Sequence, residues 1–141
     1  MKKLVGITCS TFDLLHSGHI LMLEECKKHC DYLICALQND PTVDRQTKNK
    51  PIQSLVERFI QLDAVKYVDK IVPYNTESEL EEIFKSFDID VRVIGFDYLN
   101  KDFTAKQICI DRGIKIVYNK RDHDYSTTNL RKKIHNIENK L

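Results

Sequence analysis

Two patterns in the sequence predict an α/β fold, a doubly wound parallel sheet of five strands in a single domain over residues 1–141. Short apolar runs alternate with longer segments of helical periodicity, and strands that alternate with helices form parallel sheets through right-handed crossovers. The run Asp31–Leu37 is almost continuously apolar, which is typical of a strand that helices bury on both faces. A chain of this length can bury about two-thirds of its unfolded surface around one core.

The first elements follow from simple hydrophobic patterns. The apolar run Leu4–Ile7 is the first predicted strand, and a helix is expected from about Ser17 to His29. Asp31–Leu37 is the second strand. The segment Gln38–Pro51 is polar, contains a proline near each end and is predicted to be a long functional loop.

The middle of the chain contains two capping boxes, in which a serine or threonine precedes a glutamate by three residues. Ser54 with Glu57, and Thr76 with Glu79, each predict the first turn of a helix. The elements expected here are a helix over 54–66, a short strand over 68–72 that ends before Pro73, and a helix that begins at Thr76.

The last third continues the alternation. Val91–Gly95 is a predicted strand, and a helix is expected over Phe103–Asp111, with Gly113 in the left-handed position beyond its end. Ile114–Tyr118 is the fifth strand. A final helix is expected after Ser126, which is a good N-cap residue.

Composition excludes several classes of protein. The chain has 22 Lys and Arg against 21 Asp and Glu, so it lacks the basic field of a nucleic-acid-binding protein. No apolar stretch is long enough for a membrane span or a signal peptide. Five cysteines, an odd number, indicate reduced thiols and a cytoplasmic location. Cys26, His29 and Cys30 could ligate a metal, but buried thiols are the better interpretation because no second cysteine pair follows.

The candidate site begins with the sequence T-C-S-T-F-D-L-L-H-S-G-H, from Thr8 to His19. His16 and His19 lie where the first strand gives way to a helix, with Gly18 between them. A helix N-terminus favours anions, a glycine lets a ligand approach unpaired N–H groups, and two imidazoles add donors. The pattern therefore favours phosphate binding, although surface histidines or metal ligands are the alternatives for an isolated H-x-G-H. No G-x-G-x-x-G is present, so a dinucleotide site is not predicted.

This stretch resembles the cytidylyltransferase family, whose motif is G-T-F-D-x-x-H-x-G-H. The matching residues are Thr11, Phe12, Asp13, His16, Gly18 and His19. The leading glycine of the family is Ser10 in this chain.

A second family motif, R-x-x-G-I-S-T-T, has a counterpart near the C-terminus. Arg121, Ser126, Thr127 and Thr128 match it, while Asp124 and Tyr125 replace the glycine and the isoleucine. Ser126 opens a helix whose free N–H groups can hold phosphate oxygens, and an arginine adds a planar set of donors.

The middle of the chain also resembles the family. By this resemblance Lys48 or Lys50 in the long loop, and Arg58 after it, bind substrate phosphates. Lys66 stands where several members have an arginine, and Asp97 stands at an acidic family position. The family's neighbouring acid is Phe96 here.

The resemblance implies a Rossmann-like nucleotidylyltransferase fold and transfer of CMP from CTP to a small phosphomonoester, with glycerol 3-phosphate as the best expectation and Mg²⁺ bound with the triphosphate. It implies a homodimer and no metal site of the protein's own. The implied catalytic residues are His16, His19, Lys48 and Arg121. The implied nucleotide-binding residues are Thr8, Cys9, Ser10, Thr11, Phe12, Gly18, Lys50, Arg58, Gly95, Asp97, Ser126, Thr127 and Thr128. Asp13 and Lys66 are the implied acceptor-binding residues.

Several alternatives stay open from the sequence. Related families share H-x-G-H, so an adenylyltransferase acting on a sugar 1-phosphate such as heptose 1-phosphate, or an ethanolamine-phosphate cytidylyltransferase, is possible. A catalytically silent nucleotide-binding protein is the alternative outside enzymes, given Ser10, Asp124 and Tyr125 at motif positions. An aminoacyl-tRNA synthetase is disfavoured by size, charge balance and the absence of a K-M-S-K-S-like segment.

Overall fold

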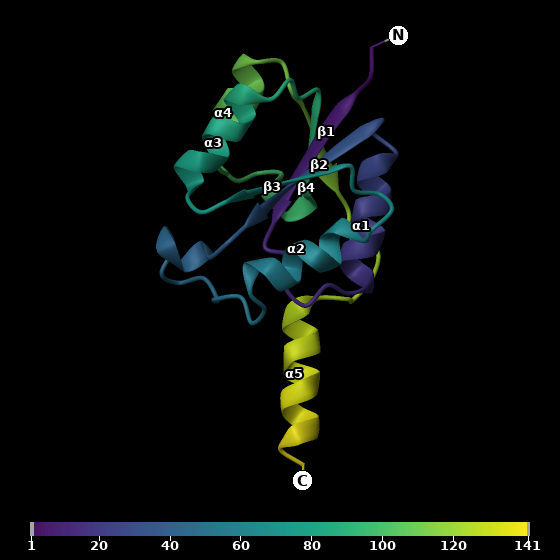
Figure 1. The fold of residues 1–141 in the computed structure, drawn as a ribbon, viewed down its shortest axis with the longest axis vertical. Coiled ribbons are helices and arrows are strands. Elements are labelled where there is room, and N and C mark those ends of the chain that lie inside the picture. Colours follow the sequence, from purple (N-terminus) through teal and green to yellow (C-terminus); the bar gives the residue numbers. More distant parts are fainter. Residues whose placement is uncertain (1, 141) are drawn as a thin grey trace.

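The computed structural model describes residues 2–140, which form one sheet flanked by helices (Figure 1). The strands are β1 (Val5–Ser10), β2 (Tyr32–Gln38), β3 (Lys70–Tyr74), β4 (Val91–Gly95) and β5 (Lys115–Asn119). The helices are α1 (Ser17–Lys27), α2 (Leu55–Asp63), α3 (Glu77–Ser86), α4 (Lys106–Asp111) and α5 (Thr127–Glu138), with short 3-10 helices at Pro41–Val43 and Phe96–Tyr98. All pairings are parallel in the order β3-β2-β1-β4-β5, which confirms the predicted doubly wound sheet.

Helices cover both faces of the sheet. On one face, Leu23 and Cys26 of α1 and Leu62 of α2 pack on the central strands. On the other face, Phe84 of α3 and Cys109 of α4 form a second cluster. Burial from both sides explains why β2 is continuously apolar, because each of its inner residues lies against a helix layer.

Local sequence signals set the helix starts as predicted. Ser54 and Thr76 form complete capping boxes with Glu57 and Glu79. The Ser126 hydroxyl accepts a hydrogen bond from the backbone N–H of Asn129 at the start of α5. These caps satisfy N–H groups that the first helical turn would otherwise leave unpaired.

Two of the differences from the expected element bounds have a clear structural cause. β3 runs through Pro73 to Tyr74, because β3 is an edge strand that pairs only with β2, and a proline there removes no ladder bond on its open side. α4 begins at Lys106 rather than Phe103, because Ala105 takes a left-handed conformation (φ 67°) that a helix cannot include.

The C-terminal helix differs from the other helices. No residue of α5 is buried, and the helix extends away from the sheet (Figure 1). None of the helices in residues 2–140 is long and apolar enough to cross a membrane.

The centre of the sheet opens at its carboxyl edge. β1 pairs with β2 from Val5 to Ser10, but with β4 only at Gly6 and Ile7. Beyond Ile7 the two central strands therefore separate. Strand order also reverses between β1 and β4, and open α/β sheets bind ligands at such a point.

Candidate active site

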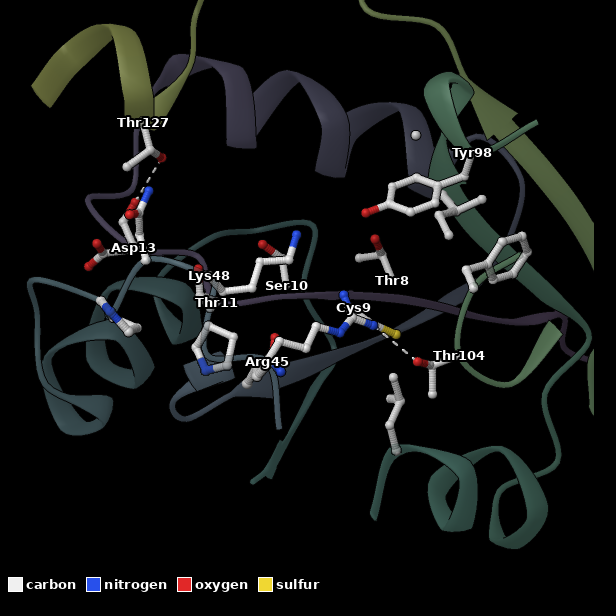
Figure 2. A pocket seen from close by; sticks show the side chains of 18 of the residues that line it. Thr8, Cys9, Ser10, Thr11, Asp13, Arg45, Lys48, Tyr98, Thr104 and Thr127 are labelled. Atoms are coloured by element: carbon white, nitrogen blue, oxygen red, sulfur yellow. Dashed lines mark hydrogen bonds between the residues drawn. The ribbon is translucent and has the colours of Figure 1, made fainter. Parts of the chain in front are cut away.

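A cavity of about 500 Å³ lies where β1 and β4 separate (Figure 2). Thr8, Cys9 and Ser10 of β1 form one wall, and Gly95 at the end of β4 faces them. Several other residues expected from the sequence also line it: Thr11, Asp13, Lys48, Lys50, Thr127 and Thr128. The structure thus brings together segments that are more than 100 residues apart in the chain.

A second hollow of about 600 Å³ adjoins the cavity and shares Met22, Gly95, Asn119 and Thr127 with it. The predicted residues that line this hollow are His16, Gly18, His19, Asp97, Arg121 and Ser126. The N-terminal ends of α1 and α5 therefore meet at one place. Both helix dipoles favour negative charge there.

His16 and His19 together cap α1. The Nδ1 of His16 accepts from the Gly18 backbone N–H at 3.0 Å, and the Nδ1 of His19 accepts from the His16 backbone N–H at 3.1 Å. The two rings lie against each other with centroids 4.0 Å apart and planes tilted by 38°. The motif spacing is therefore also the spacing of a capping box, with imidazoles in place of a hydroxyl and a carboxylate.

These bonds fix which ring nitrogen carries the proton. An Nδ1 that accepts a hydrogen bond leaves the proton of a neutral imidazole on Nε2. His16 Nε2 lies 3.2 Å from the Thr127 hydroxyl, which in turn donates to the Asp13 carbonyl at 3.2 Å. His19 Nε2 has no hydrogen-bond partner among the described side chains, and His19 lines the second hollow.

Both histidines are held neutral. Burial, together with the charge of His16, lowers the pKa of His19 to about 4. Burial and the positive charges of His123 and Arg121 lower the pKa of His16. At neutral pH the pair therefore offers N–H donors without a charge of its own, which suits hydrogen bonding to phosphate oxygens but makes a weak general base.

The backbone N–H of Gly18 is already used within the protein, because it donates to His16 Nδ1. A Cβ at this position would lie 2.8 Å from His16 Cε1 and 2.9 Å from the Tyr125 carbonyl oxygen. The glycine therefore makes room for the histidine ring and for the chain that leads into α5.

The loop between β1 and α1 has an unusual backbone. Phe12 and Leu14 have positive φ values of 50° and 51°, which cost energy in residues with a Cβ. The Asp13 carboxylate accepts from the backbone N–H groups of Ile52 and Gln53, at 2.9 and 3.0 Å, and so ties this loop to the segment before α2. Both Asp13 oxygens are thus engaged, which gives this residue an anchoring role in place of the expected acceptor contact.

Two further residues are turned away from the ligand space. The Phe12 side chain is fully buried in the core and lies against His19, with ring centroids 5.8 Å apart. Lys66 is exposed beyond the end of α2, stacks over Tyr67 and lines neither hollow. Neither side chain lines the two hollows, because the sequence match gives the order of these residues in the chain but not the direction of their side chains.

Arg58 is also a correction. Its side chain is only 2% exposed, and its three guanidinium nitrogens all donate to backbone carbonyls. The acceptors belong to Gln53, Ser54, Thr11, Gln38 and Asn39. Each guanidinium nitrogen is therefore already used to join loop segments beneath the site, which gives Arg58 a structural role in place of the expected phosphate contact.

The positions where the sequence departs from the family motifs have visible local roles. Ser10, in place of the leading glycine, accepts from the Phe12 N–H through its hydroxyl at 3.3 Å and supports the strained loop. The Tyr125 carbonyl accepts from Arg121 Nη1 at 3.4 Å, and the Tyr125 ring stacks on His123. Gly95 keeps the family residue, and a Cβ there would lie 2.5 Å from the Asp97 carboxylate oxygen Oδ1.

Several site residues were not identified from the sequence. Arg45, Arg92 and Arg131 line the cavity, and His123 lines the second hollow. Arg92 carried a usable signal, because an arginine inside the apolar strand V-R-V-I-G must lie in a layer that helices bury. Among residues 2–140, no three His, Cys, Asp or Glu side chains converge to form a metal site.

Comparison with known proteins identifies the family and several similar proteins. The family model of cytidylyltransferase-like proteins matches residues 7–133. The chain is 35% identical over 134 residues to the glycerol-3-phosphate cytidylyltransferase of Bacillus subtilis, covering 95% of this chain and 98% of that protein. It is also 35% identical over 127 residues to the bifunctional protein HldE of Caulobacter vibrioides, but that match covers 26% of HldE.

A solved structure supports the fold. The lipopolysaccharide core biosynthesis protein from Thermoplasma volcanium aligns with a TM-score of 0.67, over 89% of this chain and 100% of that chain. The two sequences are 23% identical, so the likeness bears on architecture alone.

Proposed function

Because the chain belongs to the cytidylyltransferase-like family, we propose that it transfers CMP from CTP to a small phosphomonoester and releases pyrophosphate. The family match and the similarity to a glycerol-3-phosphate cytidylyltransferase show that the chain is a nucleotidyltransferase. CTP as donor and a compact acceptor such as glycerol 3-phosphate are our more specific proposal. The Bacillus subtilis relative, which is matched over nearly its whole length, supports both.

One observation carries the proposal, namely the neutral His19 beside the start of α5. Its Nε2–H has no partner among the described side chains, and His19 lines a hollow that Ser126 and Arg121 also line. The first turn of α5 leaves backbone N–H groups without helical acceptors. A triphosphate placed here would meet donors from two helix ends and a guanidinium, which is the arrangement that nucleotidyl transfer needs.

Each residue then has a proposed role. His19 donates to a phosphate oxygen as negative charge grows toward the leaving pyrophosphate, and His16 does so when its Nε2–H exchanges the Thr127 hydroxyl for a phosphate oxygen. Arg121 with the start of α5 holds the β- and γ-phosphates. Lys48 and Lys50 approach the same anions from the long loop. Mg²⁺ would arrive bound to triphosphate oxygens, because no described cluster of side chains offers a complete metal site, and it would neutralise phosphate charge.

The acceptor supplies its own nucleophile. A phosphomonoester has a second pKa of about 6 and is already dianionic at neutral pH. Lowered histidine pKa values make His16 and His19 poor bases, so the proposed chemistry uses them only as donors.

A second candidate is an adenylyltransferase acting on a sugar 1-phosphate, because related families share H-x-G-H. The bifunctional protein HldE matches this chain over about a quarter of its own length. Pyrophosphate release should be measured for CTP and ATP against glycerol 3-phosphate, heptose 1-phosphate and ethanolamine phosphate. We expect CTP to be preferred, with glycerol 3-phosphate turned over faster than the other two. Binding of CTP without pyrophosphate release from any pair would contradict the proposal and favour a silent nucleotide-binding protein.

We also propose that the protein works as a homodimer in the cytoplasm. Apolar side chains stay exposed on α2, where Val56 is 67% and Ile60 63% exposed, and clusters of this kind mark association surfaces. Free thiols at all five cysteines support a reducing compartment.

A further inference from the structure

A buried arginine forms part of the cavity floor on the side of α3 and α4. Arg92 lies on β4, is 4% exposed and lines the cavity. Its guanidinium is held between two aromatic rings, with Cζ 4.6 Å from the Phe84 centroid and 4.8 Å from the Phe103 centroid. Stacked in this way, it can donate hydrogen bonds only along its edges.

The N–H groups along those edges are only partly hydrogen-bonded within the protein. Nη1 donates to the Thr104 carbonyl at 2.5 Å, but Nε is buried without any hydrogen-bond partner. It is the only buried side-chain nitrogen or oxygen in residues 2–140 without a partner. A buried polar group in this state costs free energy, so a native structure that keeps one needs an explanation.

The positive charge of Arg92 is not neutralised by the protein. No carboxylate of residues 2–140 forms an ion pair with it, and the nearby Glu77 is 3.5 Å from Arg45 instead. The thiols of Cys9 and Cys109 lie beside Arg92, but burial raises the pKa of both, so they stay uncharged. A buried cation without a counter-ion is expensive, and the cavity is the place from which a counter-ion can come.

A second cation converges on the same point. The Arg45 side chain crosses the cavity from the long loop, and its Nη2 donates to the Thr104 hydroxyl at 3.3 Å (Figure 2). Thr104 thus binds Arg92 through its carbonyl and Arg45 through its side chain. The two guanidinium groups and one hydroxyl form a polar cluster, and the Glu77 carboxylate lies 3.5 Å from Arg45.

Sheet register separates this cluster from the histidines. Arg92 is paired with Ile7, three residues before the end of β1, whereas His16 lies six residues beyond that end. An anion on Arg92 would therefore lie deeper in the molecule than one on His19. The two regions can hold different anionic groups at the same time.

We propose that Arg92, with Arg45 and Thr104, binds an anionic group at the end of the acceptor remote from its reacting phosphate. The inference rests on the proposed nucleotidyl transfer and narrows its acceptor class. Among compact phosphomonoesters, which include glycerol 3-phosphate, the preferred acceptor is one that carries a second anionic group, a carboxylate or a phosphate.

Three probes share a terminal phosphate and differ at the far end. 3-Phosphoglycerate has a carboxylate, glycerol 3-phosphate a neutral hydroxyl and ethanolamine phosphate a cation. Calorimetric binding of each is measured for the wild type, Arg92→Met and Arg112→Met, with and without α,β-methylene-CTP. Arg112 is the matched control because it also donates to a backbone carbonyl, that of Phe84, but does not line the cavity.

The wild type and Arg112→Met should bind 3-phosphoglycerate at least about tenfold more tightly than glycerol 3-phosphate, and ethanolamine phosphate most weakly. Arg92→Met should bind the three probes with similar affinities, while its affinity for CTP stays unchanged. The inference would be overturned if the wild type did not show this order of affinities, or if Arg92→Met kept it. It would also be overturned if Arg92→Met lowered the affinity for CTP alone. Pyrophosphate release, measured in parallel, tests the proposed function separately, because binding order is observed whether or not turnover occurs.

Discussion

Two buried arginines near the site differ in how completely their guanidinium groups are hydrogen-bonded. Arg58 is 2% exposed and Arg92 is 4% exposed, yet all three nitrogens of Arg58 bind backbone carbonyls whereas Nε of Arg92 binds nothing. Burial lowers the pKa of Arg58, and the charges of Asp13 and Asp40 oppose that effect. No described carboxylate pairs with Arg92. Burial alone therefore does not separate a structural arginine from a ligand-binding one, but the hydrogen-bond partners do.

The largest expected effect concerns Arg58. Arg58→Met should lower the free energy of unfolding by about 3 kcal/mol or more, because carbonyls of three loops lose a charged donor. Arg92→Met should be neutral or stabilising, since it removes a buried charge that the free protein leaves unpaired. Urea denaturation of both variants measures the difference. Equal destabilisation would mean that Arg92 is as structural as Arg58.

Burial of His19 makes the free energy of unfolding depend on pH. Its pKa is about 4 when folded and about 6.5 when unfolded. As pH falls from about 6.5 toward 4, the unfolded chain takes up a proton that the folded chain does not, so stability decreases by up to about 3 kcal/mol.

Denaturation at pH 7 and pH 4 measures this decrease in the free energy of unfolding. The decrease should be smaller in His19→Gln, because the variant lacks the group that takes up the proton. His135→Gln, at an exposed position on α5, is the control and should behave as the wild type. An unchanged loss in His19→Gln would show that another group causes it.

The histidines repeat the contrast between a satisfied and an unsatisfied donor. His19→Ala should lower kcat by about 10² with a smaller effect on nucleotide affinity, as loss of an oxyanion-type donor does. His16→Ala should show a similar loss in kcat and a lower Tm, because the N-cap of α1 is lost as well. His16→Asn, which keeps an acceptor for the Gly18 N–H, should recover the Tm but not kcat. Near-normal kcat in both alanine variants would remove the histidines from catalysis.

Local patterns were sufficient for most of the fold. The caps at Ser54, Thr76 and Ser126 and the left-handed Gly113 depend on a few neighbouring residues, and each appears where the sequence predicted it. Pro73 was misjudged because its tolerance depends on β3 being an edge strand, which is a property of the whole sheet.

The candidate site was predictable in part. Motif spacing identified residues that line the two hollows, such as His16, His19 and Ser126. It could not tell that Arg58 points under the site, because the direction of a side chain depends on loops that meet only in the folded chain. Arg92 belongs to none of the motifs, so only its burial and its missing partner identified it.

In the proposed reaction His19 is a neutral donor whose free Nε2–H meets the nucleotide. Long-range ¹H–¹⁵N NMR of the imidazoles at neutral pH tests it directly, with assignments from His19→Gln. We predict a neutral ring with the proton on Nε2, and a marked shift of that nitrogen when CTP and Mg²⁺ are added. A His19 ring that is doubly protonated at pH 7, protonated on Nδ1, or unchanged at saturating CTP would contradict the claim.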